Sequence, residues 1–223
     1  MQIRDTFIKK IEHELKLGYA LELPENYEET VKGGKKLPLL LFLHGMGERG
    51  SDLELLFKEG LPRLIKSGKK FPFLTLIPQC PQESLWTDET TSLHGLLTEV
   101  MEKYNVDEKR IYITGISMGG FETYEMAMAY PDLFAAAVPI CGGVANLMKR
   151  SYLERLTHLP LWIFHGELDP TVDVSLSKTI YETLQGLGAK DIHLTTYPDL
   201  AHDAWTRTYD NEELYAFLSS HSK

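Results

Sequence analysis

The sequence predicts a three-layer α/β/α sandwich with a mainly parallel central sheet and no large cap domain. Short apolar runs alternate with amphipathic stretches along the chain, which is the pattern of strands connected by helices. Several runs, such as residues 39–43, are continuously apolar, as expected for strands that are covered on both faces. The chain has 223 residues and 43% hydrophobic content, so we expect a single domain over residues 1–223 that can bury such a sheet.

Seven apolar segments are predicted to form the strands. The first alternates less cleanly than the others and precedes the first crossover, so we expect it to be an antiparallel edge strand. The predicted strands are residues 15–23, 37–43, 73–77, 111–114, 136–140, 161–164 and 193–197.

Apolar stripes at helical spacing predict helices between these strands. Ser51 and Glu54 have the spacing of a capping box, which predicts a helix start. Asp210 or Asn211 is expected to cap a last helix. Residues 25–36 are polar and predict a hairpin or loop. The three clearest stripes are Leu93, Leu96, Leu97, Val100, Met101 and Tyr104; Phe121, Tyr124 and Met128; and Leu176, Ile180, Leu184 and Leu187.

Charge and composition exclude several kinds of partner. The net charge is −9, which disfavours a nucleic-acid ligand. No apolar run reaches the length of about 18 residues that a membrane span needs. Residues 1–10 lack the apolar segment of a signal peptide, which predicts a cytoplasmic protein or one whose leader has been removed. Cys80 and Cys141 lie far apart in the sequence, and a metal site would need more ligands, so both are interpreted as buried or pocket-edge thiols. The sequence does not determine the oligomeric state, and a homodimer remains possible.

Residues 115–119 have the pattern Gly-x-Ser-x-Gly, with Ser117 at the centre. An apolar run precedes them and a helical stripe follows, which is the setting of a nucleophile elbow. A serine hydroxyl needs a base and a group that orients the base. Asp169 and His202 each follow a predicted strand, in the chain order Ser, Asp, His. Because parallel strands end at one edge of the sheet, we expect the three side chains to lie together.

Other residues compete for the roles of acid and base. Glu167 and Asp173 lie close to Asp169 in sequence, but Asp169 is preferred. His44 and His165 each precede a glycine at a strand end, and for both we expect a structural role.

An oxyanion hole requires two backbone N–H donors. Met118 follows the nucleophile and is expected to supply one. Met46, in the glycine-rich loop after the strand at residues 37–43, is expected to supply the other. The substrate-pocket candidates are Trp86, Trp205 and Cys141, although plain packing is an equal alternative for Trp86 and the preferred one for the other two.

Together these motifs resemble the α/β-hydrolase superfamily, specifically the phospholipase/carboxylesterase and predicted-peptidase branch of small serine esterases. The resemblance extends over about residues 15–218. It implies a triad of Ser117, Asp169 and His202, with Met46 and Met118 at the oxyanion hole. The matching segments are residues 17–24, 44–47, 115–120, 165–169 and 202–205.

The sequence therefore predicts a serine hydrolase that acts on small or short-chain acyl esters without a metal or organic cofactor. Residues 142–160, where this architecture often carries a lid, are too few for a large one. A sugar-linked acetyl or feruloyl esterase, a thioesterase and a peptidase remain alternatives with the same triad. A binding protein that retained the fold but lost its chemistry is the non-enzymatic alternative.

Overall fold

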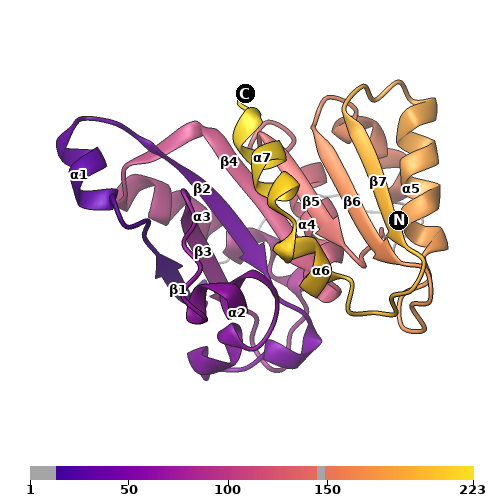
Figure 1. Cartoon of the computed structure of the whole chain (residues 1–223), viewed down its shortest axis with the longest axis horizontal. Coiled ribbons are helices and arrows are strands. Elements are labelled where there is room, and N and C mark those ends of the chain that lie inside the picture. The colour runs from indigo at the N-terminus through magenta and orange to yellow at the C-terminus, as the bar shows by residue number, and fades with distance from the viewer. Residues whose placement is uncertain (1–13, 145–148) are drawn as a thin grey trace, which may run out of the picture.

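The computed structural model describes residues 14–144 and 149–223, which include a seven-stranded sheet (Figure 1). The strand order is β1-β3-β2-β4-β5-β6-β7. β1 is antiparallel to β3, and all other neighbours are parallel, as predicted. The strands are β1 Gly18–Glu22, β2 Leu37–Leu43, β3 Leu74–Gln79, β4 Val106–Ile116, β5 Ala136–Ile140, β6 Leu161–Gly166 and β7 Ile192–Tyr197.

The strand order reverses at β2. The chain passes from β2 to β3 on one side and then crosses to β4 on the other side, from which it continues outward to β7. In open α/β sheets, ligands bind at the carboxyl edge where the order reverses. The loops after β2 and β4 meet at this place.

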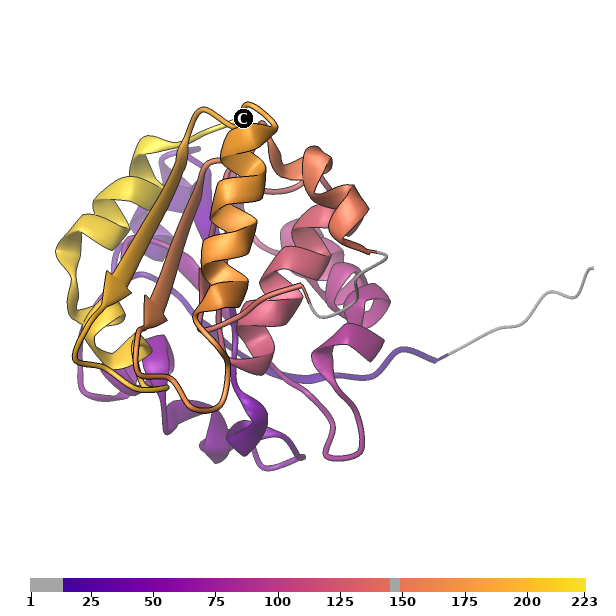
Figure 2. The same ribbon diagram turned by 90° about the vertical axis from the view of Figure 1, so that its right-hand side faces the viewer.

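Helices cover both faces of the sheet, which confirms the predicted three layers. One core contains side chains from α3 Thr90–Lys103, α4 Met118–Ala129 and α5 Ser175–Gly186. The other contains side chains from α2 Gly60–Lys66, α6 Trp205–Asp210 and α7 Glu212–Ser220. Figure 2 shows α5 and α7 on opposite sides of β6 and β7. The continuously apolar run of β2 is buried throughout, because its residues face both cores in turn.

Several local predictions need correction. Residues 25–36 contain a short helix, α1 Tyr27–Lys32, instead of a hairpin or plain loop. The capping residue near Ser51 is Asp52, whose side chain accepts the amide hydrogen of Glu54 and begins a 3-10 helix, η2 Leu53–Phe57. Leu187 lies just after α5 and is 49% exposed, so it does not belong to the buried stripe.

β4 begins five residues earlier than the predicted strand at residues 111–114. The prediction missed its first half, where the pairing with β2 is irregular. Its pairing with β2 shifts register between Leu37, opposite Val106, and Leu39, opposite Ile111. The polar residues between these two contacts hide the strand from an analysis of apolar runs. Asn211 does cap α7 by accepting the amide hydrogen of Glu213, as predicted.

No large cap covers the carboxyl edge in the described residues. The segment at 142–160 contains a short 3-10 helix, η4 Lys149–Leu156, and residues 145–148 lie outside the described part. The signal-peptide prediction concerns residues 1–10, which also lie outside it. Among the helices that the structure describes, none has the length and apolar character to cross a bilayer.

Candidate active site

Ser117 occupies a sharp turn between β4 and α4. Its backbone has φ 52° and ψ −115°, a conformation that costs energy for a residue with a side chain. The Ser117 amide donates a hydrogen bond to Ile140 O at 2.9 Å, and its carbonyl accepts one from the amide of Phe121 at 3.1 Å. The turn therefore presents the side chain at the switch point of the sheet, as the nucleophile-elbow pattern predicts.

The two motif glycines permit this turn because backbone passes directly beside them. A Cβ on Gly115 would lie 2.2 Å from Gly119 O, and a Cβ on Gly119 would lie 2.1 Å from Leu43 O. No side chain fits at these separations. The end of β2, the end of β4 and the start of α4 are thus in direct backbone contact.

Gly119→Ala is therefore expected to destabilise the protein by more than about 4 kcal/mol or to prevent folding. The obstacle is the Leu43 carbonyl, which cannot rotate away as a side chain can. Gly186→Ala is the matched control, because a Cβ there meets nothing within 4 Å, and it should change stability by less than about 1 kcal/mol. Urea unfolding of both variants measures the difference. Equal stability of the two variants would contradict this account of the elbow.

The structure brings His202 and Asp169 to Ser117. His202 Nε2 lies 2.8 Å from Ser117 Oγ, and His202 Nδ1 lies 2.6 Å from Asp169 Oδ2. Asp169 comes from the loop after β6, and His202 comes from the loop after β7. Three side chains from separate strand ends thus form one chain of hydrogen bonds at the carboxyl edge.

The carboxylate of Asp169 is buried and fully hydrogen-bonded. Its Oδ1 accepts the amide hydrogens of Thr171 at 2.8 Å and Val172 at 2.9 Å. Burial alone would raise the pKa of Asp169, but the hydrogen bonds from His202 and from these two amides outweigh it and hold the pKa below its usual value. The group is therefore an anion that faces His202 Nδ1.

The competing acids and histidines have other partners. Asp173 is exposed and accepts the amide hydrogen of Ser175, and Glu167 accepts a hydrogen bond from Thr196. His44 is buried, and its Nε2 accepts the amide hydrogen of Cys80 at 3.0 Å. None of these three side chains is hydrogen-bonded to Ser117 or His202.

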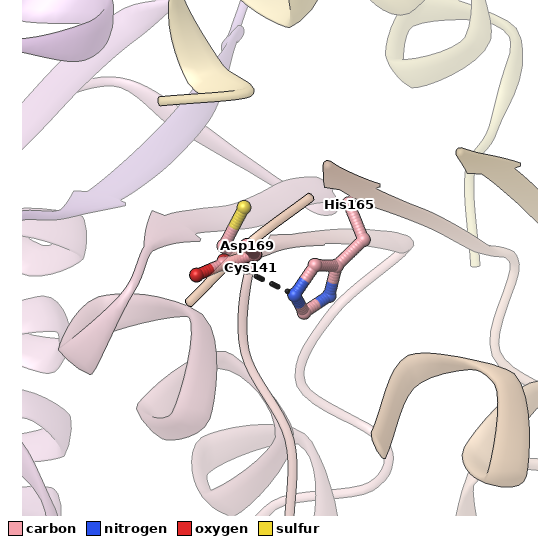
Figure 3. Close-up of side chains that lie close together, drawn as sticks. All are labelled: Cys141, His165 and Asp169. Atoms are coloured by element: carbon pink, nitrogen blue, oxygen red, sulfur yellow. Dashed lines mark ion pairs between the residues drawn. The ribbon is translucent and has the colours of Figure 1, made fainter. Parts of the chain in front are cut away.

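Asp169 also belongs to a second cluster of buried side chains, together with Cys141 and His165. Figure 3 shows Cys141, His165 and Asp169 converging, and their possible ligand atoms lie within 4.8 Å of one another. However, His165 Nε2 lies 2.8 Å from Val172 O, so it must carry a proton, while Nδ1 accepts from Ser177 Oγ at 2.7 Å. Burial raises the pKa of the Cys141 thiol to about 12. A protonated ring nitrogen and a thiol are poor cation ligands, so the cluster is better explained as hydrogen-bonded support for Asp169.

The backbone donors expected for an oxyanion hole come from two segments next to Ser117. Met118 is the first residue of α4, where an N–H has no partner within the helix. Met46 begins a 3-10 helix, η1 Met46–Glu48, in the loop after β2. That loop folds back onto the nucleophile, because a Cβ on Gly45 would lie 3.7 Å from Ser117 Cβ. The proposed roles of Met46 and Met118 rest on this placement.

Trp86 does not line the cavity beside Ser117, so its prediction as a pocket wall is corrected. It is fully buried, and its Nε1 donates to His44 O at 3.0 Å. Through this hydrogen bond to His44, Trp86 supports the loop that contains Met46. Sequence position placed Trp86 at the correct edge of the sheet, but packing turned its side chain inward.

Trp86→Phe is expected to lower kcat about 10-fold and to cost about 1–3 kcal/mol of stability. The change leaves His44 O without its indole donor and loosens the loop that carries Met46. Trp162→Phe is the control, because Trp162 also loses an indole hydrogen bond, to Thr195 Oγ1, at a distance from the site. A similar loss of kcat in both variants would show that the Trp86 effect is not local.

The other two pocket candidates differ from each other. Trp205 does line the cavity, and its ring lies edge-on to His202 with ring centroids 5.1 Å apart. Cys141 is buried outside the lining, has φ 49°, and its thiol donates to His202 O at 3.2 Å. Cys141 is therefore corrected from a pocket residue to a support of the histidine loop.

The cavity at Ser117 has a volume of about 350 Å³. The sequence did not single out three of its polar lining residues: Glu48, Glu59 and Thr171. Glu48 stands within the glycine-rich loop that was recognised, which could have drawn attention to it. Glu59 precedes α2 and carries no pattern that connects it with Ser117. The full lining is Gly45, Met46, Gly47, Glu48, Glu59, Ile116, Ser117, Thr171, His202 and Trp205.

The sheet order, the two helical layers and the elbow define an α/β-hydrolase fold. The family model described as phospholipase/carboxylesterase matches residues 61–222, and the chain belongs to this family.

Solved structures show the same architecture. A thermostable esterase is 32% identical with a TM-score of 0.77, and the match covers 93% of this chain and 60% of that chain. The acetyl xylan esterase from Aspergillus awamori is 15% identical with a TM-score of 0.66, covering 91% of this chain and 94% of the other. At that identity the second likeness shows the fold alone.

Sequence relatives share shorter parts of the chain. A bifunctional acetylxylan esterase/xylanase from Neocallimastix patriciarum is 28% identical over 185 residues, which are 79% of this chain and 24% of the relative. A poly(3-hydroxyalkanoate) depolymerase from Paucimonas lemoignei is 42% identical over 55 residues, 25% of this chain and 13% of the relative. This chain thus spans less than a quarter of the length of either protein.

Proposed function

We propose that the chain hydrolyses small or short-chain carboxylic esters through an acyl-enzyme on Ser117. One observation carries the proposal: His202 lies within hydrogen-bond distance of Ser117 Oγ on one side and of Asp169 Oδ2 on the other. This is the arrangement in which an imidazole can remove a proton from a serine hydroxyl.

In this mechanism, His202 Nε2 takes the hydroxyl proton as Ser117 Oγ attacks the ester carbonyl carbon. Asp169 keeps the proton of His202 on Nδ1 and stabilises the imidazolium that forms. The amides of Met46 and Met118 donate to the developing oxyanion. The imidazolium then protonates the departing alcohol. A water molecule, activated in the same way, releases the acid from Ser117.

The cavity supports a small acyl group. It holds about 350 Å³, and Met46, Ile116 and Trp205 provide its apolar surface. A long acyl chain would need a longer apolar channel, and no large cap builds one in the described residues. Short acyl chains can bury their apolar surface fully in this volume.

A sugar-linked acyl ester is the second candidate. The names of several relatives and structural neighbours include acetylxylan esterase and ferulic acid esterase. Glu59 and Thr171 offer polar groups beside Ser117 that could accept or donate hydrogen bonds to sugar hydroxyls. A thioesterase or peptidase activity would use the same triad, and a pure binding protein would use none of it.

Labelling with a fluorophosphonate tests the mechanism directly. We expect one label per chain, located on the peptide that contains Ser117, because only an activated serine reacts quickly with this reagent. Heat-denatured protein is the control for non-specific labelling. A folded protein that is not labelled at Ser117 would support the binding-protein alternative and contradict the proposal. A series of 4-nitrophenyl esters from acetate to palmitate, beside acetylated and feruloylated sugars, then measures the acyl and alcohol preference.

A further inference from the structure

Two carboxylates, Glu48 and Glu59, line the cavity that contains Ser117 and His202. Glu48 ends η1 in the loop that folds over the nucleophile, and Glu59 directly precedes α2. No lysine or arginine belongs to the lining among the residues that the structure describes. Apart from His202, the ionisable side chains of this lining are therefore the two carboxylates.

Within the described residues Glu48 forms no ion pair with a lysine or arginine, and the charge of Lys58 opposes only in part the effects of burial and of Glu59 on its pKa. Its side chain is 8% exposed, and the ion-pair partner found among the described residues is His44, whose Nδ1 lies 3.9 Å from Oε2. Backbone amide hydrogens of Gly45 and of Glu48 itself also hydrogen-bond to the carboxylate. Burial lowers the pKa of His44 to about 4, so this imidazole carries no charge at neutral pH. Arg49, the next residue in sequence, directs its guanidinium to Met46 O and Ser84 O. The charge of Glu48 therefore remains available to the cavity.

Glu59 is held close to the proposed base through Trp205. Its Oε2 accepts the indole hydrogen of Trp205 at 3.2 Å, and the same indole ring lies edge-on to His202. The two carboxylates also interact with each other. Burial first, and then the charge of Glu59, raises the pKa of Glu48 above its usual value. Both groups thus act on one small volume.

We propose that Glu48 and Glu59 determine substrate charge: the site accepts esters with neutral acyl and alcohol parts and rejects anionic ones. The inference rests on the proposed function. Like charges about 12 Å apart near a protein surface repel by about 1.4 kcal/mol, which changes binding about ten-fold for each carboxylate. Phosphate-bearing leaving groups, such as those of phospholipids and coenzyme A thioesters, are disfavoured by the same repulsion. Neutral sugar esters are not.

The same repulsion acts on the product. Hydrolysis converts a neutral ester into a carboxylate at Ser117, and two neighbouring carboxylates drive that anion out of the cavity. The selectivity against anionic substrates and the release of the acid product are therefore two consequences of one charge arrangement.

The test compares two esters that differ only in charge. In 4-nitrophenyl butyrate the acyl chain ends in a methyl group, and in 4-nitrophenyl hemisuccinate a carboxylate replaces that methyl. The quantity measured is the ratio of kcat/KM for butyrate to kcat/KM for hemisuccinate, after subtraction of spontaneous hydrolysis. We expect a ratio of about 100 in the native protein at low ionic strength, from about ten-fold for each carboxylate.

Glu59→Gln should lower this ratio about ten-fold while retaining an acceptor for Trp205, and Glu48→Gln combined with it should lower the ratio further. Salt at about 0.5 M should lower the ratio in the native protein but not in the double variant. Glu54→Gln is the matched control, because Glu54 has a side chain that is 78% exposed and pairs with Lys66 outside the cavity. If Glu48→Gln does not fold, Glu59→Gln and the salt dependence still test the inference.

A ratio that stays within about two-fold of the native value in Glu59→Gln and in the double variant would overturn the inference. That result leaves the proposed function intact if Ser117→Ala is inactive. Ester turnover that survives Ser117→Ala would instead reject the proposed function, whatever the charge ratio.

Discussion

Replacing Ser117 by alanine is expected to lower kcat for 4-nitrophenyl esters by about 10⁶-fold. The variant keeps His202 and Asp169 but has no oxygen to attack the carbonyl, so no acyl-enzyme can form. Stability should not fall. Serine and alanine both carry a Cβ, so the backbone at φ 52° is equally strained in both, and alanine adds no atoms. The measurement is kcat on protein whose folding is checked by thermal unfolding, with fluorophosphonate titration to detect any active contaminant.

Ser219→Ala is the control for this variant, since Ser219 is exposed on α7, away from the carboxyl edge. It should retain native kcat. Ester hydrolysis by purified Ser117→Ala at a rate within about ten-fold of the native protein would show that another group performs the chemistry.

Asp169→Asn is expected to lower kcat by about 10⁴-fold while the protein stays folded. The amide oxygen of asparagine can still accept from the amides of Thr171 and Val172, so the loop keeps its hydrogen bonds. The amide nitrogen would then face His202 Nδ1. An N–H donor at that position favours the tautomer with its proton on Nε2, which cannot accept the proton of Ser117.

Asp173→Asn separates this effect from a general change in the loop. Asp173 lies four residues away, is exposed, and caps Ser175 with an oxygen that asparagine also provides. We expect native kcat from it. If Asp173→Asn reduced kcat as strongly as Asp169→Asn, the assignment of the acid would be wrong. Single-turnover assays, with enzyme in excess over the ester, measure both variants, because they detect the very slow hydrolysis expected of Asp169→Asn.

Most strands of the sheet could be predicted from the sequence, because a strand buried on both faces has a continuous run of apolar residues. The run at residues 37–43 is apolar at every position, and its bounds agree with β2. β4 was only half recognised, since the register shift after Val106 places polar residues within the strand. The helix of residues 27–32 was missed because none of its residues is buried, so its sequence has no apolar stripe at helical spacing.

The cavity lining could not be predicted to the same degree. Trp86 follows β3 and Trp205 follows His202 by three residues. The sequence weighed pocket wall and packing equally for Trp86 and preferred packing for Trp205. The structure turns the first toward His44 and the second toward Glu59 and His202. Which way a side chain points from a loop depends on contacts with segments far away in the chain, and no local pattern records those contacts.

The sequence by itself determined that this chain forms a mainly parallel α/β sheet with a serine at a strand-to-helix turn. Local patterns decide such features, because apolar periodicity and glycine spacing act within one element. Only the tertiary structure decided that Ser117, His202 and Asp169 are joined by hydrogen bonds, and that Glu48 and Glu59 share their cavity. These contacts connect loops that are separated in the chain. They exist because the sheet reverses its strand order at β2 and gathers those loops at one edge.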